Sequence, residues 1–253
     1  MTGDPRAWPW LASGILVGAA AIGTALAFGA RPGGRRSDLL LGAAGWGGTV
    51  ALKLAATVPV GLALWLLWGE ESPLAARMLA SGLLTGVFEV GGAWLLVRWT
   101  SLREAPWNGA LAFGVAFGCA EAAVLALLVG LVGVAGLAGT PGMSPEDAKA
   151  LAETLADAAR PWTFAFERAI AVPVHALSCV LVVLAVRGRL WAPLAASFLL
   201  KTAIDAVPAE GEIPEAALQA VYGASGAASA LILLRLRPRF EALPAAAEPP
   251  PAA

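Results

Sequence analysis

Long apolar stretches separated by short polar loops run through the chain from end to end. Most of them contain about 20 apolar residues, the length that an α-helix needs to cross the hydrocarbon core of a bilayer. This pattern predicts an all-α membrane protein, a polytopic bundle of about seven transmembrane helices that forms one integral membrane domain over residues 1–242. The expected spans are residues 9–30, 39–68, 74–97, 107–133, 161–186, 190–207 and 214–234.

Two segments depart from the apolar pattern. Ser144 is followed by Pro and two acids and then by apolar residues at helical spacing, which is typical of a capped helix start. Residues 145–159 are therefore predicted to form a short amphipathic helix on the membrane surface. Residues 243–253 are rich in Pro and Ala and are predicted to be a disordered tail.

The composition supports a membrane protein. The 253 residues are 58% hydrophobic and only 14% charged, whereas soluble domains average about 25% charged residues. The sequence contains no basic patch with interleaved aromatics, so nucleic acid is not an expected partner; the expected surroundings are the lipid bilayer. Cys119 and Cys179 lie inside apolar runs and are expected to be small buried side chains. The abundance of Ala, Gly and Arg indicates a bacterial source.

The distribution of positive charge predicts the orientation. The loops after the first, third, fifth and seventh spans are rich in arginine, whereas the opposite side holds only Arg6, Lys149 and Arg160. Because cytoplasmic loops carry an excess of Arg and Lys, we expect a cell (inner) membrane protein with its N-terminus outside and its C-terminus in the cytoplasm. The arginines concerned are Arg31, Arg35, Arg36, Arg98, Arg103, Arg187, Arg189, Arg235, Arg237 and Arg239.

Several polar residues lie within the expected spans. At 1.5 Å per residue, six of them are roughly 14–23 Å from one face and so near the middle of the membrane. Each charge at that depth costs roughly 2.5–3.5 kcal/mol, so we expect these groups to face inward and pair, as Lys201 and Asp205 can across one helical turn. The six mid-depth residues are Lys53, Glu89, Glu121, His175, Lys201 and Asp205, and Glu167, Arg168 and Ser178 accompany His175 on the fifth span.

Each of these residues also has a purely structural interpretation. His175 could be a hydrogen-bonded core group, and Lys53 could be a pore-facing or snorkelling residue. Lys201 and Asp205 could form an ion pair that fixes the register of their helix. As a set, intramembrane charges indicate a functional site. Small residues spaced four apart, at Gly14/Gly18, Gly82/Gly86 and Gly114/Gly118, favour close packing of helices.

Four polar stretches resemble, in order and spacing, the YhfC-type intramembrane metalloproteases, a family similar to the CAAX prenyl protease and bacteriocin-processing superfamily. The stretches are Val87–Trp94, Leu111–Ala122, Glu167–Ser178 and Leu200–Asp205. The resemblance covers about residues 75–210 and is most specific in the Glu-Arg…His…Ser block. It implies catalytic positions at Glu89, Glu121, Glu167 and His175, with His175 as a metal ligand and zinc as the possible cofactor.

This chain departs from the family pattern at four positions. The family implies a second Glu, an Arg and two further His, where this sequence has Val90, Ala93, Phe117 and Lys201. A catalytic zinc is typically held by three protein ligands with one open position for water, and a peptidase also needs a carboxylate to take a proton from that water. One imidazole remains here, and an ammonium at Lys201 would repel a dication. The motifs therefore indicate a degenerate metal site.

Three functions stay open at this point. The first is a catalytically inactive relative, a pseudoenzyme whose scaffold binds a membrane protein or a peptide client. The second is an active intramembrane metallopeptidase with a reduced ligand set, and the third is a transporter or proton-coupled carrier that uses Lys53, Lys201 and Asp205 as a relay. Whether the chain is an enzyme thus stays open. The first two predict that Glu89, Glu121, His175 and Lys201 meet in one pocket.

Overall fold

The computed structural model describes residues 3–139, 142–206 and 214–243, so nearly all of the expected tail, residues 244–253, lies outside the described residues. Within these ranges every regular element is a helix. Six segments are long and apolar enough to cross a membrane. They are Pro5–Gly29 (η1, Pro5–Ala7, and α1, Trp8–Gly29), α2 (Arg36–Trp68), Leu74–Trp99 (α3, Leu74–Thr85; η3, Gly86–Val90; α4, Gly91–Trp99), α5 (Trp107–Ala138), α7 (Arg160–Gly188) and α9 (Glu215–Glu241).

The other helices are shorter: η2 (Gly69–Glu71), η4 (Ser101–Glu104), α6 (Pro145–Ala156) and α8 (Trp191–Asp205). The segment at the sixth expected span is α8, and its 15 residues cover about 22 Å, less than the roughly 30 Å of a hydrocarbon core. The prediction of an all-α membrane bundle is confirmed, with six candidate spans in the described residues and α8 beside them.

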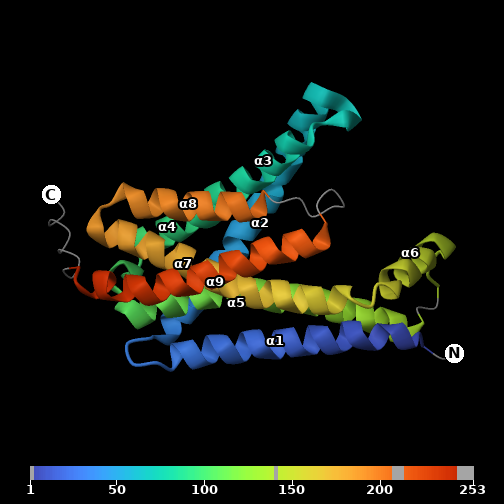
Figure 1. Cartoon of the computed structure of the whole chain (residues 1–253), viewed down its shortest axis with the longest axis horizontal. Helices are drawn as coiled ribbons and strands as arrows, with labels where there is room; N and C mark the ends of the chain where they lie inside the picture. Colours follow the sequence, from blue (N-terminus) through green and yellow to red (C-terminus); the bar gives the residue numbers. More distant parts are fainter. Residues whose placement is uncertain (1–2, 140–141, 207–213, 244–253) are drawn as a thin grey trace.

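The helices α5 and α7 form the centre of the bundle (Figure 1). The helices α1, α2 and α7 pack on α5, and α8 and α9 pack on α7. Glycines allow the closest approaches: a Cβ at Gly114 of α5 would lie 2.8 Å from the Cα of Ala176 in α7. A Cβ at Gly14 of α1 would lie 2.7 Å from the Cα of Gly130 in α5. These backbones are therefore in contact, as small residues permit.

The hairpin of α2 and α3 leaves the bundle and projects away from it (Figure 1). The most apolar stretch of α2 has no buried residue, and Val58, Leu62 and Leu66 are each exposed. An apolar helix face of this kind suits the hydrocarbon of a bilayer, where burial inside protein is not required.

The arginine-rich loops meet at one end of the molecule. Asn108 at the start of α5 donates a hydrogen bond to the carbonyl of Pro32 in the α1–α2 loop, at 2.8 Å. Arg187 at the end of α7 donates to the carbonyls of Ala105, at 3.2 Å, and Leu243, at 3.3 Å. These bonds tie the α1–α2 loop, the start of α5 and the ends of α7 and α9 together. We call this region the basic end.

The N-terminus and α6 lie at the opposite end (Figure 1). The backbone N–H of Asp4 bonds to the carbonyl of Gly136 near the end of α5, at 3.1 Å. Leu155 of α6 is buried against Ala7 and Trp10. Because α6 is capped by Ser144, whose Oγ accepts from the N–H of Asp147 at 3.1 Å, the polar segment begins as a regular helix.

Candidate functional site

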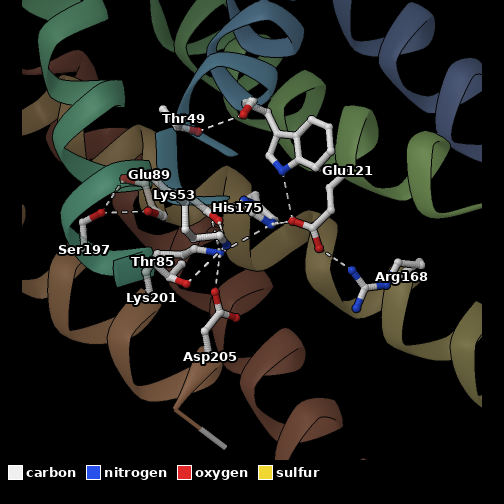
Figure 2. A network of polar contacts seen from close by, with 12 residues as sticks. Thr49, Lys53, Thr85, Glu89, Glu121, Arg168, His175, Ser197, Lys201 and Asp205 are labelled. Atoms are coloured by element: carbon white, nitrogen blue, oxygen red, sulfur yellow. Dashed lines mark hydrogen bonds and ion pairs between the residues drawn. The ribbon is translucent and has the colours of Figure 1, made fainter. Parts of the chain in front are cut away.

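Polar side chains from α2, η3, α5, α7 and α8 converge at the centre of the bundle (Figure 2). Glu89, Glu121, His175 and Lys201 meet there, so the four side chains that the sequence places at one depth also share one site. We call these four residues, together with Lys53, Arg168 and Asp205, the central network.

Glu89 lies on a π-helical turn, η3, inserted between α3 and α4. Such turns occur as short irregularities inside α-helices, frequently at functional sites. The carboxylate is buried, with only 3% of the residue exposed, and a cation stands on each side of it. Lys53 Nζ lies 2.9 Å from Oε1, and Lys201 Nζ lies 3.0 Å from Oε2. Glu89 is therefore a buried anion held between two ammonium groups.

Lys201 is the most enclosed cation of the network. It comes from α8 and is 3% exposed. Besides Glu89, its Nζ lies 3.8 Å from Asp205 Oδ2, one helical turn further along α8, and 3.5 Å from His175 Nε2. The ammonium group thus faces two carboxylates and the imidazole at once.

His175 and Glu121 form the other half of the network. His175 Nε2 lies 2.9 Å from Glu121 Oε2, and the same oxygen accepts a hydrogen bond from Trp46 Nε1 at 3.2 Å. The other oxygen of Glu121 pairs with Arg168 (Figure 2). At 2.9 Å from a carboxylate oxygen, Nε2 carries a proton and donates it. Glu121 is therefore bound by an imidazole, an indole and a guanidinium.

Helix packing holds His175 in this position. A Cβ at Gly118 of α5 would lie 3.0 Å from the Cβ of His175, so the glycine allows α7 to lie close enough. The ring of Phe117 lies beside the imidazole, with 5.4 Å between ring centroids. An imidazole in place of Phe117 would therefore face His175.

The charges of the central network cancel. Its three carboxylates, Glu89, Glu121 and Asp205, are matched by three cations, Lys53, Lys201 and Arg168. Removing either partner from such a buried pair leaves an uncompensated charge. The network is therefore electrically complete with His175 neutral and without any added ion.

The donor atoms of Glu89, Glu121 and His175 lie within 4.8 Å of one another. Zinc ligands at about 2.0–2.1 Å in tetrahedral geometry stand about 3.4 Å apart, so the types and spacing of these donors suit a metal after a small contraction. The neighbouring charges do not suit it. Lys201 stands against two of the three donors, and a metal could bind His175 Nε2 only after that nitrogen had released the proton that it donates to Glu121. As arranged, the residues do not fit a divalent metal.

Glu167 and Ser178 lie outside the central network. Glu167 accepts a hydrogen bond from Gln219 of α9 at 2.8 Å and lies 3.9 Å from Arg160. Ser178 shares a 2.8 Å hydrogen bond with Ser197 of α8. Each side chain thus links α7 to a neighbouring helix.

A cavity of about 60 Å³ connects Glu167 to the network, and its lining includes Glu121, His175, Lys201 and Asp205. A water needs about 10–15 Å³ of such space, so the cavity can hydrate one side of the cluster. Tyr222 and Ser225 of α9 complete its polar lining.

Sequence reasoning missed three polar side chains in or beside the site: Trp46, Thr85 and Ser197. Trp46 is buried within α2 and binds Glu121 through its indole N–H. Its position seven residues before Lys53, two turns along one helix face, was the available signal. Thr85 and Ser197 are single hydroxyls in apolar helices, and nothing in their spacing distinguishes them.

The comparison with protein families gives one match. The family described as YhfC intramembrane metalloprotease matches residues 35–222, which is more than half of the chain and includes every residue of the central network. No curated protein and no solved structure matches the chain.

Proposed function

Because the chain belongs to the YhfC intramembrane metalloprotease family, we propose that it keeps the scaffold of that family and has exchanged the catalytic metal for an internal ion network. In this proposal the protein does not cleave peptide bonds. It binds a membrane protein or a peptide client within the bilayer.

The position of the Lys201 ammonium carries this proposal. The group lies 3.0 Å from Glu89 Oε2 and 3.5 Å from His175 Nε2, in the space that a metal bound to those atoms would need. A lysine there supplies positive charge without a Lewis acid or a metal-bound water, which a metallopeptidase requires. The apolar Phe117 beside His175 further reduces the set of possible ligands.

The exposed face of α2 supports a role in binding. Its apolar residues extend along the outer part of the hairpin, which projects from the bundle (Figure 1). A transmembrane helix of a partner can pack against such a face without displacing any part of the bundle.

A second candidate function is an active metallopeptidase with a reduced ligand set. The close grouping of Glu89, Glu121 and His175 favours it. An active metallopeptidase would require two changes before a metal could bind. Lys201 would have to move away from Glu89, and His175 would have to release the proton that it donates to Glu121.

Metal analysis of the purified protein separates the two candidates. We expect far less than one equivalent of zinc per chain after extraction in mild detergent with zinc present. Stoichiometric zinc that is lost in Glu89→Gln or His175→Ala would refute the ion network and support the peptidase.

A gain-of-binding variant tests the same point from the other side. Phe117→His with Lys201→His adds two imidazoles next to His175 and removes the ammonium, so we expect this protein to bind zinc. Phe117→Leu with Lys201→Gln is the matched control, which removes the same side chains without adding ligands and should stay free of metal. If the double histidine variant folds and binds no zinc, the site is not a converted metal centre.

A further inference from the structure

A cleft at the basic end lies apart from the central network. It opens between α4, the end of α7 and the start of α8 and has a volume of about 160 Å³. Two arginines, Arg98 and Arg189, and two tryptophans, Trp94 and Trp191, line it together with apolar side chains such as Leu194. Neither the ion network nor the family comparison gives this cleft a role.

The cleft has an excess of positive charge. Arg98 and Arg189 are exposed, and in the described ranges no carboxylate pairs with either of them. Arg98 lies over the ring of Trp94 instead, with 5.5 Å between the guanidinium carbon and the ring centroid. The two guanidinium groups are therefore available to an anion from outside the chain.

The start of α8 adds to this charge. The helix begins at Trp191, and its N-cap, Leu190, makes no capping hydrogen bond through its side chain. The first backbone N–H groups of a helix lack partners inside the helix and favour an anion. Since Leu190, Trp191 and Leu194 all line the cleft, this helix end faces it.

Arg189 has an unusual backbone conformation. Its φ of 52° lies in the left-handed region, and it is the only non-glycine residue with positive φ in the described part of the chain. Helices commonly end on a residue in this conformation, usually glycine, and here Gly188 stands one position too early. An arginine held in a strained position at a cleft is consistent with a role for its side chain.

We propose that this cleft binds the phosphate of an anionic phospholipid at the level of the headgroups. A lipid is favoured over a soluble phosphate because indoles concentrate at the membrane interface and Trp191 is 77% exposed there. The apolar lining from Leu190 and Leu194 can meet the first part of an acyl chain. Basic pockets between transmembrane helices are known to bind such headgroups.

The test is lipid binding by the purified full-length protein in a neutral detergent. Thermal unfolding is followed while phosphatidylglycerol, phosphatidylcholine or inorganic phosphate is added. Because a ligand that binds only the folded state raises the unfolding midpoint, phosphatidylglycerol should raise it and the other two should not. Each basic residue near the surface contributes about five-fold in affinity, so Arg98→Gln with Arg189→Gly should weaken the apparent affinity about 30-fold.

Two further variants keep the test decisive. Arg189→Gly alone relieves the backbone strain, so its midpoint without lipid should be no lower than that of the wild type, while its lipid affinity falls about five-fold. Arg235→Gln removes an exposed arginine of the same end outside the cleft and should bind lipid as the wild type does. Equal shifts with both lipids, an equal shift with inorganic phosphate, or an equal loss in Arg235→Gln would each overturn the proposal.

Discussion

At the scale of single residues, charge compensation decides what the central site can do. Glu89 lies between Lys53 and Lys201, while Glu121 is held by His175 and Arg168. An unpaired carboxylate is costly in a membrane interior, and each of these two glutamates is paired with a cation from another helix. The identity of residue 201 therefore determines whether Glu89 has a second cation inside the protein.

Replacing Lys201 by Met should strongly destabilise the folded protein. The change leaves the buried Glu89 carboxylate with one cation in place of two, and breaking a buried ion pair typically costs about 3–5 kcal/mol. Adding Glu89→Gln to the same protein should recover much of that loss, because the excess negative charge of the network is then removed. Unfolding in detergent, followed by circular dichroism, measures both changes.

The control for this experiment is Asp205→Asn. Asp205 Oδ2 lies 3.8 Å from Lys201 Nζ, and the Asp205 side chain is 32% exposed. The expected loss of unfolding free energy is therefore within about 1 kcal/mol. If Lys201→Met is no more harmful than Asp205→Asn, the lysine does not stabilise the site through Glu89.

Counting residues from the membrane faces was sufficient to predict that Glu89, Glu121, His175 and Lys201 meet, because a charge inside a membrane has to pair with a group at the same depth. The same reasoning did not give the partners themselves. Trp46 donates to Glu121 through a single N–H, which a hydropathy pattern does not register, and Arg168, which is not among the six mid-depth residues, pairs with the same carboxylate.

At the scale of elements, two local features position the site. The π-helical turn at Gly86–Val90 changes the direction in which Glu89 faces relative to the helices on either side of it. The glycines of α5 let α7 approach until backbones touch. The sequence showed the glycine spacing, but it could not show the π turn, because one displaced hydrogen bond leaves no periodic signal.

Gly114→Ala should therefore destabilise the bundle by about 1–3 kcal/mol, as overpacking does. The added Cβ would lie 2.8 Å from the Cα and 2.9 Å from the carbonyl oxygen of Ala176, both backbone atoms that cannot move alone. Gly48→Ala in α2 is the control, since nothing lies within 4 Å of its added Cβ; it should be neutral or stabilising by up to about 1 kcal/mol. Equal midpoints for the two variants in thermal unfolding would mean that the α5–α7 contact is looser than described.

At the scale of the whole molecule, the two ends differ in charge. The arginine-rich loops are gathered at the basic end by hydrogen bonds among Asn108, Arg187 and backbone carbonyls, while α6 and the N-terminus lie at the other. We propose on this basis that the basic end faces the cytoplasm of a cell whose inner membrane holds the protein. The amphipathic α6 would then lie on the outer surface.

Labelling with a membrane-impermeant maleimide tests this orientation. Lys149→Cys on α6 should react in intact cells, whereas Ser101→Cys at the basic end should react only after permeabilisation. Both positions are exposed, and the native Cys119 and Cys179 are buried, which gives a wild-type control without labelling. The opposite pattern would invert the orientation.

The helical bundle itself was predictable because apolar length alone specifies a membrane-crossing helix. The bounds of α8, Trp191–Asp205, differ from the expected span of residues 190–207 by one or two residues at each end. The protrusion of the α2–α3 hairpin, in contrast, has no sequence signal, because a helix that faces lipid and one that faces protein are equally apolar.

The balance of charge within the central network has an electrical consequence. Moving one elementary charge across a membrane that carries a voltage of 100 mV changes its energy by about 2.3 kcal/mol. With His175 neutral, three carboxylates and three cations sum to zero, so shifting the whole cluster along the membrane normal moves no net charge through that field. The membrane potential then exerts no net force on the central network as a unit.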